Sequence, residues 1–385
     1  MLAGLVYFAS AGLPRIKDNR SDSSELVDSS VEKKLEGIKD TIQKNFYAYD
    51  DKRTVGIESM QDGMYKGLLN SLNDPYSVYY TQEELTQLMS DTEGVYQGIG
   101  AYVSVDDNGM PVITGVIDDS PAEEAGLRER DIIYMVEDTD VSGMDLSSVV
   151  SLIKGKEGTY VMLTIVRDGE SDFLKINVER RKIETPTVTS KMLTDDVGLI
   201  SISEFDEVTV DQFADARDGM LSSGARGLII DLRSNPGGSL DSVVKICRMI
   251  LPKGIIVYTE DVEGNRVDYE CDGSSEISVP LVVLINGYSA SASEIMAGAI
   301  KDYGVGTLVG TTTYGKGIVQ RVIDLKDGTA IKLTIAAYYT PKGTNIQGTG
   351  IEPDVEVEFD SKAYYDDNKD NQMDKALEVL EGKIG

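Results

Sequence analysis

The sequence predicts an α/β protein whose second half contains a largely parallel sheet. Three observations support this: a helical first segment, a glycine-punctuated β-rich middle segment, and a last segment in which apolar strands alternate with helical patterns. Strands separated by connections of helix length usually pair in parallel. The strands expected in this sheet are VGLISIS, RGLIIDL, GIIVYTE and PLVVLIN, and the helices expected between and after them are residues 210–221, 240–251 and 292–302.

Composition limits the classes of partner. The chain has 385 residues, of which 41% are hydrophobic, and this is enough for two or three domains with real cores. It carries 66 acidic and 37 basic residues, so its formal net charge is −29. A charge of this sign argues against binding to nucleic acid or electrostatic docking on anionic lipid.

The N-terminus is interpreted as a truncated or atypical export anchor with a tether, residues 1–24. Residues 2–13 are almost wholly apolar, but they are fewer than the roughly 20 that a membrane helix needs, and no basic region precedes them. A polar, serine-rich stretch follows at residues 17–30. A short apolar element that docks on the fold is the alternative.

Residues 25–93 are expected to form a helical N-terminal domain. Apolar residues recur there at spacings of three and four, and an Asn-Asp-Pro turn at residues 73–75 interrupts the pattern. The repeating positions are Leu35, Ile38, Ile42 and Phe46.

Residues 94–182 resemble a PDZ domain in the order of their short strands, their glycine-rich turn and their helix-like DLSSVVSLIKG. In PDZ domains the glycine-rich turn presents N–H groups to the C-terminal carboxylate of a peptide, which pairs with the neighbouring strand. The resemblance implies that this carboxylate loop is Gly98, Ile99, Gly100 and Ala101, and that the groove is walled by Val149, Val150 and Ile153. A small β-domain with a purely structural role is the alternative.

A serine run in a chain without histidine points to unusual nucleophilic chemistry. SASASE at residues 289–294 follows the apolar strand PLVVLIN, as expected for a nucleophile at a strand-to-helix turn. Because the chain has no histidine, it cannot supply a Ser-His-Asp triad, and lysine is the main alternative base. Lys316 lies between Gly315 and Gly317, and it follows Ser291 by 316 − 291 = 25 residues.

The same region offers groups that could assist a serine nucleophile. The N–H of Ala292, at the predicted start of a helix, could stabilise an oxyanion, and a second donor could come from the turn Asn235-Pro236-Gly237-Gly238. Lys316 must be neutral to accept a proton, so we expect burial to lower its pKa from the ordinary 10.4. Gln320, four residues later, could orient the amine without restoring its charge.

Two further patterns lead to no site. Cys247 lies in a helix-like apolar stretch and is expected in the core, although a bridge to Cys271 stays open. The spacing of Asp366, Asn368 and Asp370 is similar to the start of a calcium loop, but the glycine and the bidentate glutamate of such a loop are missing. We therefore predict no metal and no cofactor.

Taken in order, these motifs resemble those of the C-terminal processing peptidases, also called tail-specific proteases. The resemblance spans nearly the whole chain and rests on DPYSVYY, SPAEEAGL, DLRSNPGG, SASASEIMAGAIKD, TYGKGIVQ and GIEPDVEV. It implies a core similar to that of the crotonase and Clp-protease superfamily, with an inserted PDZ domain. It also implies catalytic roles for Ser291, Lys316 and Gln320, and oxyanion donors at Gly237 and Ala292. One departure is Glu129-Arg130, where the family commonly has Pro-Gly.

The expected organisation is therefore a PDZ domain at residues 94–182, a protease core at 183–360 and a C-terminal helical segment at 361–385. The resemblance implies a serine endopeptidase that cleaves exported proteins near their free C-termini, gated by its PDZ domain. It further implies a homo-oligomer, an activating protein partner, and a location at the outer face of a bacterial cytoplasmic membrane or outside the cell. The alternatives are a non-catalytic PDZ adaptor or pseudoprotease and, on a related core, acyl-CoA chemistry.

Overall fold

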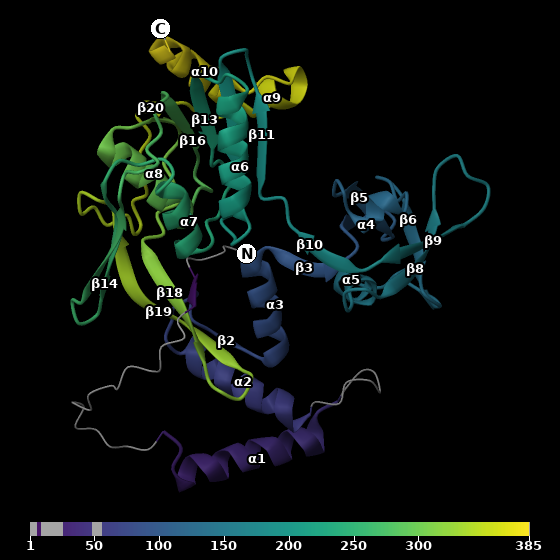
Figure 1. Cartoon of the computed structure of the whole chain (residues 1–385). Coiled ribbons are helices and arrows are strands. Elements are labelled where there is room, and N and C mark those ends of the chain that lie inside the picture. The colour runs from purple at the N-terminus through teal and green to yellow at the C-terminus, as the bar shows by residue number, and fades with distance from the viewer. Residues whose placement is uncertain (1–5, 9–25, 48–55, 385) are drawn as a thin grey trace. The chain divides into compact units, whose positions relative to one another are not determined.

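The computed structural model describes residues 6–8, 26–47 and 56–384 (Figure 1). The chain divides into two compact units. To the extent that they are described, the larger unit comprises Met1–Tyr7, Glu83–Gln320 and Thr334–Gly385, and the smaller comprises Phe8–Gln82 and Arg321–Leu333. The predicted anchor and tether lie outside the described residues, apart from strand β1 (Val6–Phe8). None of the described helices is both long enough and apolar enough to cross a membrane.

A mostly parallel sheet forms the centre of the larger unit and confirms the predicted α/β class. Its strand order is β11-β12-β13-β16-β17-β20, and every neighbouring pair from β12 to β20 is parallel. Only β11 runs antiparallel to its neighbour. The strands are β11 (Val188–Met192), β12 (Val197–Ile202), β13 (Gly227–Asp231), β16 (Leu281–Ile285), β17 (Thr307–Gly310) and β20 (Val355–Glu356).

Helices cover both faces of this sheet. Successive side chains of a strand point to opposite faces, so each strand contributes residues to both layers. Leu228 and Ile230 of β13 join the cluster formed with helices α6 (Thr209–Ser222), α7 (Leu240–Cys247) and α8 (Ala292–Tyr303). Ile229, between them, joins the opposite cluster, to which α10 contributes Ala376 and Leu380. The C-terminal part consists of α9 (Ser361–Asp367) and α10 (Asn371–Ile384), and Figure 1 shows α10 beside β13 and β16.

One predicted member of the parallel sheet is wrong. GIIVYTE forms β14 (Gly254–Asp261), which pairs antiparallel with β15 (Arg266–Cys271) and with β19 (Ala330–Tyr339) in a separate sheet. The connection from β14 to β15 is a tight turn around Gly264, too short for the crossover that a parallel pair requires. Strand β18 (Ile318–Asp324), the sheet neighbour of β19, completes the predicted hairpin after Gly317.

The PDZ-like segment is a second sheet with its own core. Its strands are ordered β4-β5-β6-β8-β9, with the short β7 beside β6, and their buried apolar residues form a separate cluster. The elements are β4 (Ala101–Val105), β5 (Pro111–Val116), α4 (Pro121–Glu124), β6 (Ile132–Val136), β7 (Thr139–Asp140), α5 (Leu146–Ile153), β8 (Tyr160–Val166) and β9 (Leu174–Glu179).

The unusual Glu129-Arg130 turn keeps the conformation that glycine would favour. Arg130 has a φ of 74°, in the left-handed region, and its N–H donates to the carbonyl of Ile113 at 2.7 Å. The following Asp131 is 1% exposed and accepts two hydrogen bonds from the Arg167 guanidinium, at 2.7 and 2.8 Å. This ion pair fixes the turn, although an arginine in this conformation costs about 1 kcal/mol relative to glycine.

The chain enters and leaves the PDZ-like segment through two paired strands. β3 (Val95–Gly98) and β10 (Arg181–Glu184) form an antiparallel ladder of their own, with Arg181 opposite Gly98 and Glu184 opposite Val95. Helix α3 (Gln82–Glu93) leads into β3.

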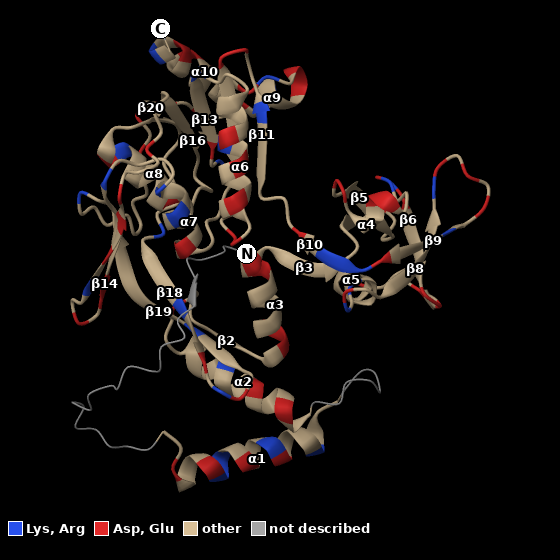
Figure 2. Cartoon of the chain, viewed as in Figure 1, with Lys and Arg blue, Asp and Glu red and all other residues tan. Residues whose placement is uncertain are grey.

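The smaller unit contains helices α1 (Ser29–Asn45) and α2 (Ile57–Asn70) and strand β2 (Val78–Tyr80). Acidic and basic residues alternate along α1, none of whose residues is buried (Figure 2). The expected helical character of this part is therefore observed, with one addition, since β2 pairs antiparallel with residues 330–332 of β19. Tyr79 of β2 is 4% exposed, as expected for a packing residue.

Asp206, in the loop after β12, is a buried carboxyl group whose ionisation opposes folding. The residue is 6% exposed. Burial, and next the negative charges of Glu204 and Asp91, raise the pKa of Asp206 to about 7. Because this value exceeds that of an unfolded aspartate, folding favours the protonated form, and stability falls as pH rises from about 4 through 7.

We expect Asp206→Asn to raise the melting temperature at pH 8 and to change it much less at pH 5, where the wild-type carboxyl is already protonated. Asp215→Asn, on the exposed face of α6, is the control and should show no such pH-dependent difference. Calorimetric melting at both pH values measures the effect. An equal shift at pH 5 and pH 8 would contradict the assignment.

Candidate active site

Ser291 occupies a sharp turn between β16 and α8. β16 is wholly buried, and Ser291 immediately precedes the first residue of α8 with φ 57° and ψ −110°. A positive φ is uncommon for a residue with a side chain and marks local strain, which is frequent at active sites. A strained strand-to-helix turn of this kind presents the nucleophile in many serine hydrolases. The turn was predicted from the sequence, but the strained conformation was not.

Glu294, three residues after Ser291, binds the serine turn to the lysine loop. Its Oε2 accepts hydrogen bonds from the N–H groups of Ser291 at 2.8 Å and Lys316 at 2.9 Å. Its Oε1 accepts from Thr313 Oγ1 at 2.6 Å and from the N–H of Gly315 at 2.7 Å. No role was predicted for this glutamate, although a Ser-x-x-Glu spacing at a helix start is the signature of a capping box.

Burial raises the pKa of Glu294, and the hydrogen bonds from Thr313, Lys316, Gly315 and Ser291 oppose that shift. The residue is fully buried, so these donors replace the water that would otherwise solvate it.

Lys316 and Gln320 are also buried, at 1% and 0% exposure. Gln320 Nε2 donates to Thr334 Oγ1 at 3.3 Å, whereas its Oε1 accepts no hydrogen bond from any described residue. Tyr338 Oη lies 3.0 Å from the carbonyl oxygen of Ser291 and 2.5 Å from that of Lys316. No sequence signal marked Tyr338, which belongs to an ordinary apolar strand.

The Asn235-Pro236-Gly237-Gly238 turn lies directly against Ser291. A Cβ on Gly237, whose φ is 107°, would lie 2.7 Å from the carbonyl oxygen of Ala290, 2.8 Å from Ser291 Cβ and 3.0 Å from the N atom of Ala292. Only glycine allows this approach. The structure thus places Gly237, one predicted oxyanion donor, directly against Ser291 and Ala292, the other.

The Gly237 N–H is nevertheless engaged within its own turn. It donates to Asn235 Oδ1 at 2.8 Å, so in this conformation it does not point freely at a substrate position. The Ala292 N–H belongs to the first helical turn, whose N–H groups lack intrahelical partners.

Much of the predicted PDZ groove lines a cavity of about 360 Å³, to which Asp91, Glu204 and Asp206, outside the PDZ-like segment, also contribute. Five of the predicted groove residues line it, namely Gly98, Ile99, Ala101, Val150 and Ile153. Gly100 and Val149 do not line it. Gly100 has a φ of 82° and lies against Ser120, whereas Val149 is fully buried in the core of the PDZ-like segment.

The two thiols are separate, and the described part of the chain forms no metal cluster. Cys247 and Cys271 are both buried and free, so the bridge that the sequence left open is absent. Among the described residues, no group of three or more acidic or cysteine side chains is arranged to hold a metal ion.

Comparison with known proteins gives consistent matches. The family model of peptidase family S41 matches residues 196–357, and that of the PDZ domain matches residues 112–167. The carboxy-terminal processing proteases CtpA and CtpB of Bacillus subtilis are 36% and 35% identical, over 85% and 86% of this chain and 69% of each relative. A crystal structure from Bacteroides fragilis described as an S41 protease supports the fold alone, with a TM-score of 0.52 at 19% identity over 87% of this chain and 92% of that one.

We expect Glu294→Gln to lower the free energy of unfolding by about 2–3 kcal/mol. This loss is expected even though glutamine has nearly the same size as glutamate and no buried charge. The amide nitrogen would face donors where a carboxylate oxygen now accepts, and two of the four hydrogen bonds would be lost. Urea unfolding measures the change. Glu352→Gln, on an exposed side chain, is the control and should be neutral; an equally neutral Glu294→Gln would refute the role of the carboxylate.

Proposed function

The chain belongs to peptidase family S41, the family of the carboxy-terminal processing proteases, and we propose that Ser291 and Lys316 are the nucleophile and base of this serine peptidase. The observation that supports this most strongly is that one carboxylate oxygen, Glu294 Oε2, accepts hydrogen bonds from the N–H groups of both residues. Two segments separated by 25 positions in sequence therefore meet at one atom.

In the proposed mechanism Ser291 Oγ attacks the carbonyl carbon of the scissile peptide bond while neutral Lys316 accepts its proton. Lys316 then donates that proton to the leaving amine, and water hydrolyses the acyl-enzyme by the same route. Burial supports the neutral form of an amine, and Lys316 is almost fully buried. Gln320 Oε1 is a buried acceptor that could hold the ammonium formed after attack.

The proposed oxyanion donors are the N–H groups of Ala292 and Gly237. One such donor contributes about 3–4 kcal/mol to transition-state stabilisation in serine peptidases. Gly237 can contribute only after its N–H leaves Asn235 Oδ1, so we infer that substrate binding reorients this turn. Since Ser291, Lys316 and Gln320 are all buried, a substrate also has to open a path to them.

We propose that the PDZ domain binds the free C-termini of protein substrates and thereby gates the site. The apolar part of the cavity lining, Ile99, Val150 and Ile153, suits an apolar C-terminal side chain, and the Gly98–Ala101 turn suits the carboxylate. We further propose that the protein acts outside the cytoplasm on exported proteins, which cell fractionation would test. A homo-oligomer and an activating partner stay predictions from the family resemblance.

Ser291→Ala and Lys316→Ala should each abolish cleavage of a fluorogenic peptide by the purified protein while leaving it folded, as circular dichroism would show. Because the two groups act as one unit, the double variant should be little worse than either single one. Wild-type activity should rise with pH, as more Lys316 becomes neutral. Substantial activity in Lys316→Ala, or a wild-type rate that falls steadily from pH 6 to 9, would rule out the mechanism.

A peptide with an apolar C-terminal residue should bind the Ser291→Ala protein at least tenfold more tightly than the same peptide with an amidated C-terminus. The reason is that charge-assisted hydrogen bonds from the N–H groups of the turn contribute about 1.5–3 kcal/mol. Calorimetry at moderate salt, where repulsion from the acidic chain is screened, measures both affinities. Equal affinities would show that the PDZ domain does not read C-termini.

A further inference from the structure

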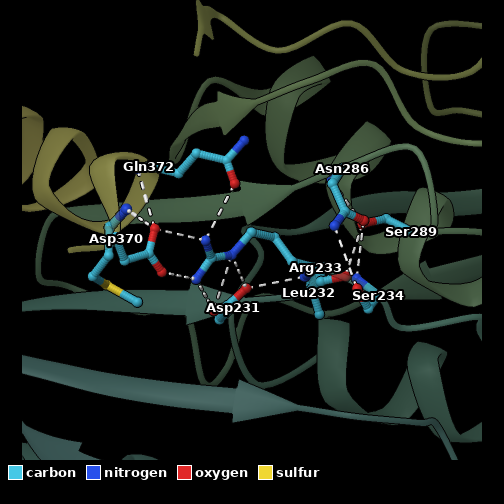
Figure 3. A network of polar contacts seen from close by, with 9 residues as sticks. Asp231, Leu232, Arg233, Ser234, Asn286, Ser289, Asp370 and Gln372 are labelled. Carbon is cyan, nitrogen blue, oxygen red and sulfur yellow. Dashed lines mark hydrogen bonds and ion pairs between the residues drawn. The ribbon is translucent and has the colours of Figure 1, made fainter. Parts of the chain in front are cut away.

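Arg233 follows the last residue of β13 by two positions and is held by two carboxylates that are far apart in the sequence, those of Asp231 and Asp370 (Figure 3). Its Nε and Nη2 donate to Asp231 Oδ1 and Oδ2 at 2.9 and 2.7 Å. Its Nη1 and Nη2 donate to Asp370 Oδ1 and Oδ2 at 3.0 and 2.8 Å. The Arg233 side chain is 15% exposed, so both ion pairs are well shielded from solvent.

Asp370 is at the same time the capping residue of α10. Its Oδ1 accepts hydrogen bonds from the N–H groups of Gln372 and Met373 at 3.1 and 3.0 Å. Gln372, which is 1% exposed, adds a further bond from Arg233 Nη1 and donates to the carbonyl of Val357 at 2.7 Å. The start of the C-terminal helix is therefore fixed to Arg233, and the calcium-like spacing in the sequence marks this ion pair instead of a metal site.

From Arg233 the hydrogen bonds continue to the serine turn. The next residue, Ser234, donates its N–H to Asn286 Oδ1 at 2.9 Å, and the preceding carbonyl, of Leu232, accepts from Ser289 Oγ at 2.7 Å. The carbonyl of Asn235 accepts from the N–H of Ala290 and from Ser293 Oγ, both at 3.0 Å. Every residue from Leu232 to Asn235 is thus tied, directly or through Arg233, to another segment.

Charge favours this arrangement on both sides. Burial works against the charged guanidinium, but the hydrogen bonds to Asp231 and Asp370 outweigh it and raise the pKa of Arg233. Burial likewise opposes ionisation of Asp370, but its bonds from Arg233 and from the N–H groups of α10 hold its pKa below the ordinary value. Both groups therefore stay charged throughout the pH range in which the site would work.

We propose that Asp370 is a positioning residue, which acts through Arg233 to hold residues 232–235, the segment that leads into Gly237, in register with Ser291. This inference rests on the proposed function, since it assumes that Gly237 supplies an oxyanion donor. The C-terminal helix then has a part in catalysis without touching the substrate, because it sets the position of a donor whose displacement by about 1 Å is enough to slow a reaction greatly.

Asp370→Asn tests this, because the amide oxygen can keep the cap of α10 while the carboxylate that faces Arg233 is lost. We expect kcat to fall at least tenfold with little change in KM, and the affinity for a peptide boronic acid, which mimics the tetrahedral intermediate, to fall in parallel. Asp366→Asn removes the same charge from an exposed position four residues earlier and should match the wild type.

Arg233→Lys keeps the positive charge but loses the planar guanidinium that binds both carboxylates. It tests the same ion pair through its other partner if Asp370→Asn proves unstable. It should give a similar loss of kcat, and the double variant should be little worse than either, since both break one unit. All rates are measured at a temperature at which circular dichroism shows every variant folded. Unchanged kcat in both single variants would overturn the proposal.

Hydrogen exchange provides a readout that is independent of activity. Asp370→Asn should speed exchange of the amides in residues 232–238 and 289–292 but not in the PDZ sheet. If Asp370→Asn leaves exchange in these residues unchanged, the positioning role is wrong, whatever the activity of the variant. If the wild type shows no cleavage that depends on Ser291, the proposed function fails, and the exchange experiment still decides whether Asp370 holds the turn.

Discussion

The carboxylate of Glu294 is enclosed by four donors, and the arrangement of the site depends on this enclosure. Its oxygens have no access to water. If any one of the four hydrogen bonds were lost, no water would replace it, and the buried carboxylate would be left with too few donors. The conformation of residues 291 and 313–316 is consequently fixed as a group. The strained φ of Ser291 is tolerable for this reason, because the hydrogen bond from its own N–H to Glu294 would be lost if the turn relaxed.

The candidate catalytic residues are buried, so the candidate site is closed to solvent. Ser291, Lys316 and Gln320 have almost no exposed surface, and the Gly237 N–H is occupied by Asn235. In the proposed mechanism a closed site suits a peptidase without a histidine, because desolvation favours the neutral form of the Lys316 amine. In the same proposal closure would limit indiscriminate cleavage, because the free energy for opening would come from binding of the correct substrate.

The sequence was sufficient for those features that local pattern determines. The alternation of strands and helices, the strand-to-helix position of Ser291 and the glycines around Lys316 and Gly237 all follow from residues close together in the chain. It was insufficient where partners are remote. Arg233 and Asp370 are 137 positions apart, and nothing local distinguishes their pairing from two solvated charges. GIIVYTE has the composition of a central parallel strand. In the structure its connection to β15 is too short for a parallel crossover, and the two strands pair antiparallel. Tyr338 likewise gave no signal.

The paired strands β3 and β10 have an implication for the history of this architecture. Because they run antiparallel in register, the PDZ-like segment begins and ends at neighbouring points of the fold. A module with adjacent termini can be gained, lost or exchanged by recombination without altering the path of the host chain, much as a tight hairpin loop can be lengthened. Recognition and hydrolysis could therefore have diversified separately, with new specificities acquired by replacement of the insert while the Glu294-centred site stayed unchanged.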